Sequence, residues 1–262
     1  MVLYFSATGN TKYIAETLAK LLEDECLNLL PRIKSRDVSA ILSETPFVIC
    51  APIYVAEMPR FLASYLRTVP LLGNRTVYFV STSGGYSGVS GVLAGELFQK
   101  KGMEYKGSSG FKMPRNYIAN NVFSQSGQAE IEKLLLASAK RLPEIARTIR
   151  SGGVLKSKHV WLLELWITVP FNPVWCRINQ PTPPFHVNDT CISCGKCGRL
   201  CPVNAITMVN GKPLWTKESC AHCMSCIQNC PVEAIEYGNI TQQKKRYLFE
   251  KYRYVLEDKG QE

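Results

Sequence analysis

Residues 2–23 read VLYFSATGNTKYIAETLAKLLE, an apolar run, a turn of small hydroxylated residues and a helix pattern in direct succession. The run Val2–Phe5 predicts a strand, and apolar residues that recur at helical spacing from Tyr13 to Leu21 predict a helix over about 10–24. The turn therefore lies at the carboxyl end of a strand and the amino end of a helix. Free backbone N–H groups and a partial positive charge at that end suit an anion.

The same alternation of elements continues to about residue 150. We expect strands at 2–5, 26–30, 47–51, 76–81 and roughly 104–113. We expect helices at about 10–24, 59–68, 88–101 and 128–150. This order predicts right-handed βαβ units and a parallel sheet with helices on both faces. In such sheets ligands bind at the carboxyl ends of the strands, near the point where the strand order reverses.

The turn at the first strand narrows the choice of anion. It lacks the GxxxxGK[ST] motif of nucleoside triphosphate sites and the GxGxxG motif of dinucleotide sites. It offers instead the hydroxyls of Ser6, Thr8 and Thr11, beside Gly9 and Asn10. Hydroxyls together with backbone N–H groups suit a phosphate monoester.

This turn resembles the flavodoxin phosphate loop, [ST]-x-T-G-x-T. The resemblance covers residues 1–150 and implies a flavodoxin-like, doubly wound parallel sheet of order 2-1-3-4-5 that binds FMN at its switch point. In that family the loops after the third and fourth strands, here APIYVAEMP and STSGGYSG, flank the flavin ring. The FMN-binding residues it implies are Ser6, Thr8, Gly9, Asn10, Thr11, Pro52, Ile53, Tyr54, Thr82, Ser83, Gly84, Gly85 and Tyr86. Ordinary loop packing is the alternative role for Tyr54 and Tyr86.

Eight of the eleven cysteines form two copies of C-x2-C-x2-C-x3-C-P, 29 residues apart. This is the spacing of bacterial ferredoxins, in which the fourth cysteine of each run ligates the other cluster. One cluster is therefore expected to bind Cys191, Cys194, Cys197 and Cys230. The other is expected to bind Cys220, Cys223, Cys226 and Cys201. The alternative is a pair of zinc sites, although zinc sites usually group cysteines in separated pairs.

Residues 185–238 resemble the two-cluster bacterial ferredoxins, which implies two [4Fe–4S] clusters, one-electron transfer and a smaller α+β ferredoxin-like domain. Outside the motif, Cys26 and Cys50 lie in expected strands and are interpreted as inert core residues. Cys176 is a linker thiol for which a redox role stays open. His222, between two ligands, is interpreted as a surface residue, with tuning of the cluster as the alternative.

The remaining segments are a connection over 151–184 and a tail over 239–262. The connection is rich in Pro and Trp and contains HVWLLELWITV, residues 159–169, which is too short to span a membrane. We interpret it as an element packed on a domain surface, with a membrane-interface anchor as the alternative. The tail is expected to be a helix docked on the body.

The net charge of +10 comes mainly from residues 1–150, which hold 18 Lys/Arg and 12 Asp/Glu. This excess suits acidic partners, but no nucleic-acid motif or aromatic-laced basic groove is visible. No secretory signal and no apolar run of roughly 20 residues is present, so we expect a cytoplasmic protein without a transmembrane segment. A homodimer stays open.

Taken together, the two halves resemble a flavodoxin–ferredoxin fusion family of anaerobes. Clusters pass electrons singly whereas FMN holds one or two, so the resemblance implies an electron-transfer iron–sulfur flavoprotein that couples one- and two-electron steps. We expect a redox protein with an acidic docking surface as its partner.

Two alternatives to this function remain. One is a ferredoxin-linked flavin reductase acting on a small molecule such as a quinone, and the other is a redox sensor without turnover. The loop PIYVAEMP favours the reductase, since it lacks the glycine common in flavodoxins. No acid/base pair is evident, because His159, His186 and His222 lie outside the expected flavin domain; Tyr54 and Glu57 are the candidates within it.

Overall fold

The computed structural model describes residues 1–122, 124–156, 160–216 and 220–257. Its larger body contains a five-stranded parallel sheet of order β2-β1-β4-β6-β7. The strands are β1 (Val2–Tyr4), β2 (Cys26–Asn28), β4 (Phe47–Pro52), β6 (Thr76–Ser83) and β7 (Glu104–Lys112). Counted along the chain among themselves, these five strands have the order 2-1-3-4-5, so the predicted topology is confirmed.

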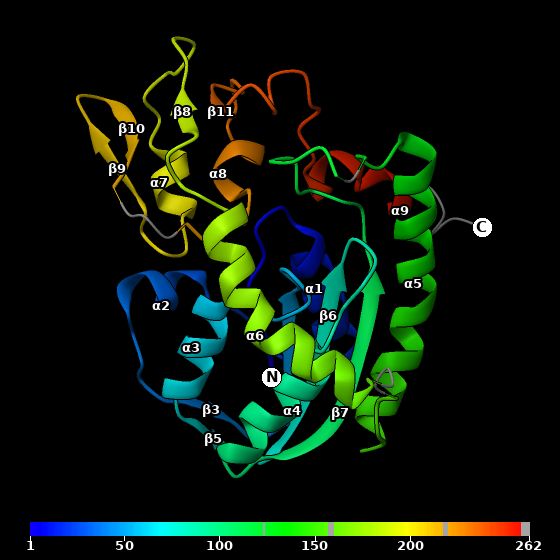
Figure 1. Ribbon diagram of the computed structural model, residues 1–262. Coiled ribbons are helices and arrows are strands. Elements are labelled where there is room, and N and C mark those ends of the chain that lie inside the picture. Colours follow the sequence, from blue (N-terminus) through cyan, green and yellow to red (C-terminus); the bar gives the residue numbers. More distant parts are fainter. Residues whose placement is uncertain (123, 157–159, 217–219, 258–262) are drawn as a thin grey trace.

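Helices cover both faces of this sheet because its strands are apolar on both sides (Figure 1). The side chains of Val48 and Cys50 face the core formed with α1 (Asn10–Leu22) and α5 (Gln128–Arg150). The alternate residues Phe47 and Ile49 face a second core, formed with α3 (Arg60–Thr68) and α4 (Ser90–Lys100). Three short elements were not predicted from the sequence: α2 (Leu30–Ser35), β3 (Ile41–Ser43) and β5 (Leu71–Gly73).

The smaller domain lies beyond the carboxyl ends of the sheet strands (Figure 1). It contains two antiparallel strand pairs, β8 with β11 and β9 with β10. Its elements are β8 (Phe185–Val187), α7 (Lys196–Leu200), β9 (Ile206–Val209), β10 (Lys212–Trp215), α8 (Ser225–Gln228) and β11 (Ile235–Tyr237).

The connection forms a helix, α6 (Leu162–Asn179), that crosses the front of the larger body in Figure 1. It continues through Pro170 and Pro173, so it is longer than the short element expected from the sequence. His159 lies outside the described residues. Among those residues, none of the helices combines the length and the apolar character that crossing a bilayer requires.

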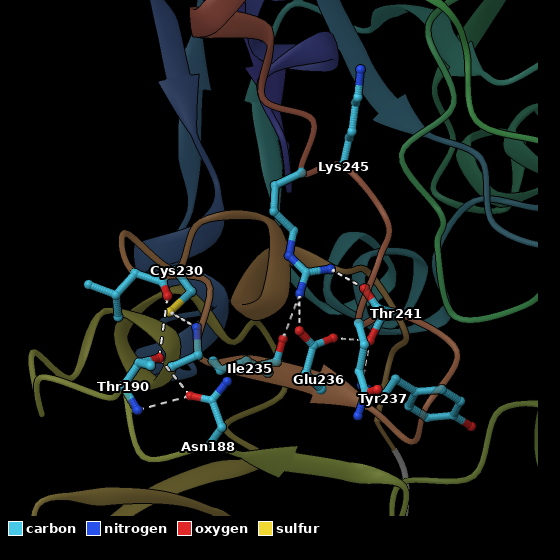
Figure 2. Close-up of polar contacts among 12 residues, drawn as sticks. Asn188, Thr190, Cys230, Ile235, Glu236, Tyr237, Thr241 and Lys245 are labelled. Carbon is cyan, nitrogen blue, oxygen red and sulfur yellow. Dashed lines mark hydrogen bonds and ion pairs between the residues drawn. The ribbon is translucent and has the colours of Figure 1, made fainter.

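The tail runs from the smaller domain back to the larger one. A buried ion pair fixes its start, because Arg246 Nη2 lies 2.7 Å from Glu236 Oε1 on β11. Thr241 donates a hydrogen bond to the same carboxylate (Figure 2). Tyr247 and Val255 then enter the core beside α1 and α5. The docking of the tail is as expected, but helical structure is limited to η1 (Phe249–Tyr252) and α9 (Tyr254–Glu257) among its described residues.

Candidate functional site

The turn between β1 and α1 closes through its own side chains. Gly9 precedes the first residue of α1 with a φ of 100°, and its N–H donates to Ser6 Oγ at 3.1 Å. A Cβ on Gly9 would lie 2.7 Å from the Cβ of Phe249, so both the backbone conformation and the tail require glycine here. Thr8 and Thr11 are buried beside it.

A cleft of about 360 Å³ opens where the carboxyl ends of β1, β4, β6 and β7 meet. Ten of the thirteen predicted flavin residues line it: Ser6, Thr8, Asn10, Thr11, Pro52, Ile53, Tyr54, Thr82, Ser83 and Gly84. Gly9 lies in the turn behind this lining, while Gly85 and Tyr86 are exposed outside it. Tyr86, with 53% of its surface exposed, is not brought to the cleft.

Sequence reasoning missed the loop after β7. Met113, Pro114 and Asn116 line the cleft from this fifth strand. Asn116 Nδ2 donates to Thr8 Oγ1 at 2.6 Å, and Asn10 Nδ2 donates to the Pro114 carbonyl at 3.1 Å. The expected strand over 104–113 could have indicated this loop. In a parallel sheet the residues that follow the carboxyl end of each strand lie at the edge where ligands bind.

The loop after β4 folds back on itself beside the cleft. Tyr54 N–H donates to Glu57 O at 2.8 Å, and the reciprocal bond is 3.2 Å long. The turn between them places Val55 at φ 48° and Ala56 at φ 67°. Left-handed backbone is costly for a β-branched residue, so this turn needs support. Asn172 of α6 provides part of it, since its Nδ2 donates to the Val55 carbonyl at 2.6 Å.

The eight motif cysteines surround two hollows in the smaller domain. A proximal cavity of about 300 Å³, on the side of the flavin cleft, is lined by Cys201, Cys220, Cys223 and Cys226. A distal cavity of about 320 Å³ is lined by Cys191, Cys194, Cys197 and Cys230. Each cavity thus combines three cysteines of one run with the fourth cysteine of the other. Within the described part of the chain, no group of three or more His, Cys, Asp or Glu side chains is placed to hold a single metal ion.

The internal repeat extends to the backbone around these cavities. Gly195 and Met224, 29 positions apart, both adopt left-handed backbone and immediately precede α7 and α8. The N–H of Ala205 donates to Cys201 Sγ at 3.2 Å, and the N–H of Ala234 does the same to Cys230 Sγ at the same distance. Such N–H···S bonds stabilise negative charge on a ligating sulfur.

The proximal thiols are poor thiolates on their own. Burial raises the pKa of the Cys220 thiol to about 11, and it also raises the pKa values of Cys223 and Cys226 well above their usual range. Buried thiolates need a cation to offset this cost, and bound iron would supply it. The chemistry of the four sulfur donors therefore fits an iron–sulfur cluster.

The proximal cavity abuts the flavin cleft. Cys223 lies in the same apolar core as Ala7, and Tyr54 packs against that core. Burial raises the pKa of the Tyr54 phenol, and the charges of Cys223 and Cys220 raise it further. Its Oη is buried and has no hydrogen-bond partner among the described residues. Tyr54 therefore lies between the two predicted cofactor sites.

Hydrogen bonds join the two domains around this contact. Ser225 Oγ donates to the Ala7 carbonyl at 3.3 Å, and Gln228 Nε2 donates to the Asn116 carbonyl at 2.6 Å. On the other side, Lys34 Nζ donates to the carbonyl oxygen of Cys201 at 2.9 Å. The cleft and the proximal cavity are thus held together from both domains.

Two sequence interpretations are wrong. His222 is not a surface residue: it is 2% exposed, and its Nδ1 lies 3.2 Å from Tyr117 Oη, because the aromatic residues of the smaller domain pack around it. Cys26 is not a core residue, because β2 is an edge strand and Cys26 is exposed. Cys50 is buried as expected, and Cys176 is half-buried on α6.

Comparisons with known proteins bear on both halves. A family model for a flavodoxin domain matches residues 1–100, and a model for a 4Fe-4S dicluster domain matches residues 184–231. A comparison with curated proteins gives no match.

The solved structures that are similar to this chain cover about half of it. Trp repressor binding protein from Bacillus subtilis is 17% identical over 54% of this chain and 95% of that chain, with a TM-score of 0.33. Two-electron reduced Megasphaera elsdenii flavodoxin is 15% identical over 53% of this chain and 99% of that chain, with a TM-score of 0.31. The two family matches show a flavodoxin domain and a 4Fe-4S dicluster domain in one chain, which matches a flavodoxin–ferredoxin fusion and supports a role in electron transfer as an iron–sulfur flavoprotein.

Proposed function

We propose that this chain passes electrons between two [4Fe–4S] clusters and FMN, and so couples one- and two-electron steps. When bound, the clusters supply one-electron exchange and FMN supplies exchange of one or two electrons. The observation that supports this function best is the shared wall of the two sites, where Tyr54 lines the flavin cleft and packs against the core that includes Cys223.

In this proposal the β1–α1 turn binds the phosphate of FMN. Ser6, Thr8 and Thr11 line a cleft at the amino end of α1 and could supply their hydroxyls to it. Asn116 orients Thr8, and Thr82 orients Thr11 through a contact of 2.8 Å between their hydroxyls. These groups match a phosphate monoester, which supports FMN over a dinucleotide.

The exposure of the cysteines suggests the order of the two clusters. Cys201, Cys223 and Cys226 of the proximal cavity are buried, whereas Cys194 of the distal cavity is exposed. Electrons would therefore exchange with a partner at the distal cavity and reach FMN by way of the proximal one.

Charge at the distal cavity supports an acidic partner. Arg199 is exposed there, and its Nη1 donates to the Cys194 carbonyl at 2.9 Å. A redox protein with an acidic docking surface would meet this cation beside the exposed thiol. The net charge of +10 would favour the same encounter.

Anaerobic purification followed by analysis of flavin, iron and sulfide tests the cofactor set. We expect about one FMN, roughly eight iron and roughly eight sulfide per chain. Cys230→Ser and Cys191→Ser should each remove the same distal cluster, and Cys201→Ser should remove the other. Zinc in place of iron, or a preparation without flavin, would contradict the proposal.

Glu57 supports reduction of a small molecule as a second candidate function. Burial raises the pKa of its carboxyl against the opposing effect of Arg60 and Arg67, and Oε1 is buried without a partner among the described residues. A carboxyl that retains its proton at higher pH can deliver it near the flavin cleft. If so, quinone should reoxidise the reduced wild type much faster than Glu57→Gln, while a one-electron acceptor protein should react equally with both.

A further inference from the structure

Exposed apolar side chains gather on α6. Of the twenty large hydrophobic residues that are exposed in the described chain, eight lie between residues 161 and 178. They are Trp161, Trp166, Ile167, Val169, Phe171, Val174, Trp175 and Ile178. A concentration of this kind marks an interaction surface in most proteins.

Most of these residues lie on one side of the helix. At 100° per residue, six of the eight span about half of its circumference, and Trp161 and Val169 lie outside that arc. The opposite side packs on the body, where Asn172 is buried and bonded to the Val55 carbonyl. The exposed side therefore points away from the protein and is called the α6 face below.

A cation lies on the α6 face. Arg177 is exposed on α6 itself, beside Ile178. The one acidic residue of α6, Glu164, is only partly exposed.

We propose that the α6 face binds the surface of an anionic lipid bilayer, with the helix lying in the plane of the interface. Tryptophan and aliphatic side chains enter the headgroup region, where indole rings are favoured, and Arg177 meets lipid phosphates. The net charge of +10 favours this surface and opposes pairing of two copies through the same face. Because Asn172 holds the loop beside the flavin cleft, docking brings that cleft close to the membrane.

Vesicle flotation tests the proposal with the anaerobically prepared holoprotein. We expect binding to phosphatidylcholine vesicles that contain phosphatidylglycerol, weaker binding to phosphatidylcholine alone, and loss of the difference at high salt. The double variant Ile167→Ser/Ile178→Ser should bind on the order of tenfold less tightly. Leu72→Ser is the matched control, because Leu72 is 50% exposed on β5, and it should bind as the wild type does.

Cofactor absorption spectra identify variants that have misfolded. If the double variant loses its cofactors, lipids brominated on their acyl chains should still quench the tryptophan fluorescence of the wild type. The proposal is overturned if anionic vesicles fail to bind the wild type, if the folded double variant binds equally well, or if no quenching occurs. A wild-type dimer that dissociates in the double variant would overturn it as well, and would assign the α6 face to self-association.

Discussion

The side-chain amide of Asn229 donates a hydrogen bond of 3.0 Å to the backbone carbonyl of Ala7. Asn229 follows α8 and precedes Cys230, whereas Ala7 lies in the turn predicted to bind the flavin phosphate. The same amide also donates to the Ser225 carbonyl at 2.9 Å. One side chain thus joins the segment between the two cysteine cavities to the flavin cleft.

Asn229→Asp should loosen this junction. The substitution keeps the shape of the side chain but replaces the donor with a carboxylate that faces two carbonyl oxygens. We expect a loss of about 1–3 kcal/mol in the free energy of unfolding of the holoprotein, together with slower electron exchange between clusters and flavin. Denaturant unfolding and flash photoreduction measure the two effects. Asn239→Asp, at an exposed position, is the control, and equal behaviour of the two variants at unchanged iron content would argue against the junction.

Thr8→Val should weaken binding of FMN but not of riboflavin. The variant keeps the volume of the side chain and loses the hydroxyl that accepts the hydrogen bond from Asn116. Loss of one hydrogen bond to a charged phosphate costs about 1.5–3 kcal/mol, or roughly 10- to 100-fold in affinity. Fluorescence titration of the flavin-free protein with both flavins measures the change. An equal loss for FMN and riboflavin would mean that Thr8 does not contact the phosphate.

Tyr54→Phe should lower the reduction potential of the proximal cluster. The buried phenol lies near Cys223 and Cys220, and a hydrogen bond from it would stabilise the more negative, reduced cluster. Loss of about 1 kcal/mol corresponds to roughly 40 mV for one electron. Potentiometric titration followed by electron paramagnetic resonance measures the shift. The distal cluster is the internal control, and a proximal potential equal to that of the wild type would rule out this bond.

Cys26 should be alkylated slowly at neutral pH although it is exposed. The residue as a whole is exposed, but partial burial of its sulfur raises its pKa to about 11, and Glu16 raises it while Lys12 lowers it. A thiol with a raised pKa holds its proton to higher pH, so we expect about a hundredfold less thiolate at pH 7 than for an ordinary cysteine. Mass spectrometry after iodoacetamide treatment should show labelling that keeps rising up to about pH 11. Glu16→Gln should speed labelling, and a plateau near pH 9 would refute the raised pKa.

Local patterns in the sequence were sufficient to predict the fold and most of the residues that line the predicted flavin site. Both the turn from Ser6 to Thr11 and the 29-residue cysteine repeat can be recognised from the spacing of a few residues. The backbone conformations of Gly195 and Met224 repeat at the same interval. The remaining features depend on tertiary contacts. Asn116 reaches Thr8 across 108 positions, and no periodicity in the sequence reports such a contact.

Tertiary structure also explains two differences between the expectations and the structure, at Cys26 and in α6. Cys26 has the sequence context of a buried strand, but β2 is the last strand of the sheet and leaves it exposed. Only a short element was expected in the Pro-rich connection, whereas α6 continues through Pro170 and Pro173 with its inner side, including Asn172, held against the body.

Flash photoreduction of the flavin in the anaerobic holoprotein tests the central claim most directly. After a pulse that delivers one electron to FMN, bleaching of the cluster absorbance reports arrival of the electron at the cysteine cavities. We predict a first-order rate that does not change with protein concentration, since Tyr54 and the Ala7 contacts hold the two sites together within one chain. A rate proportional to protein concentration, or no bleaching of the clusters, would contradict the account.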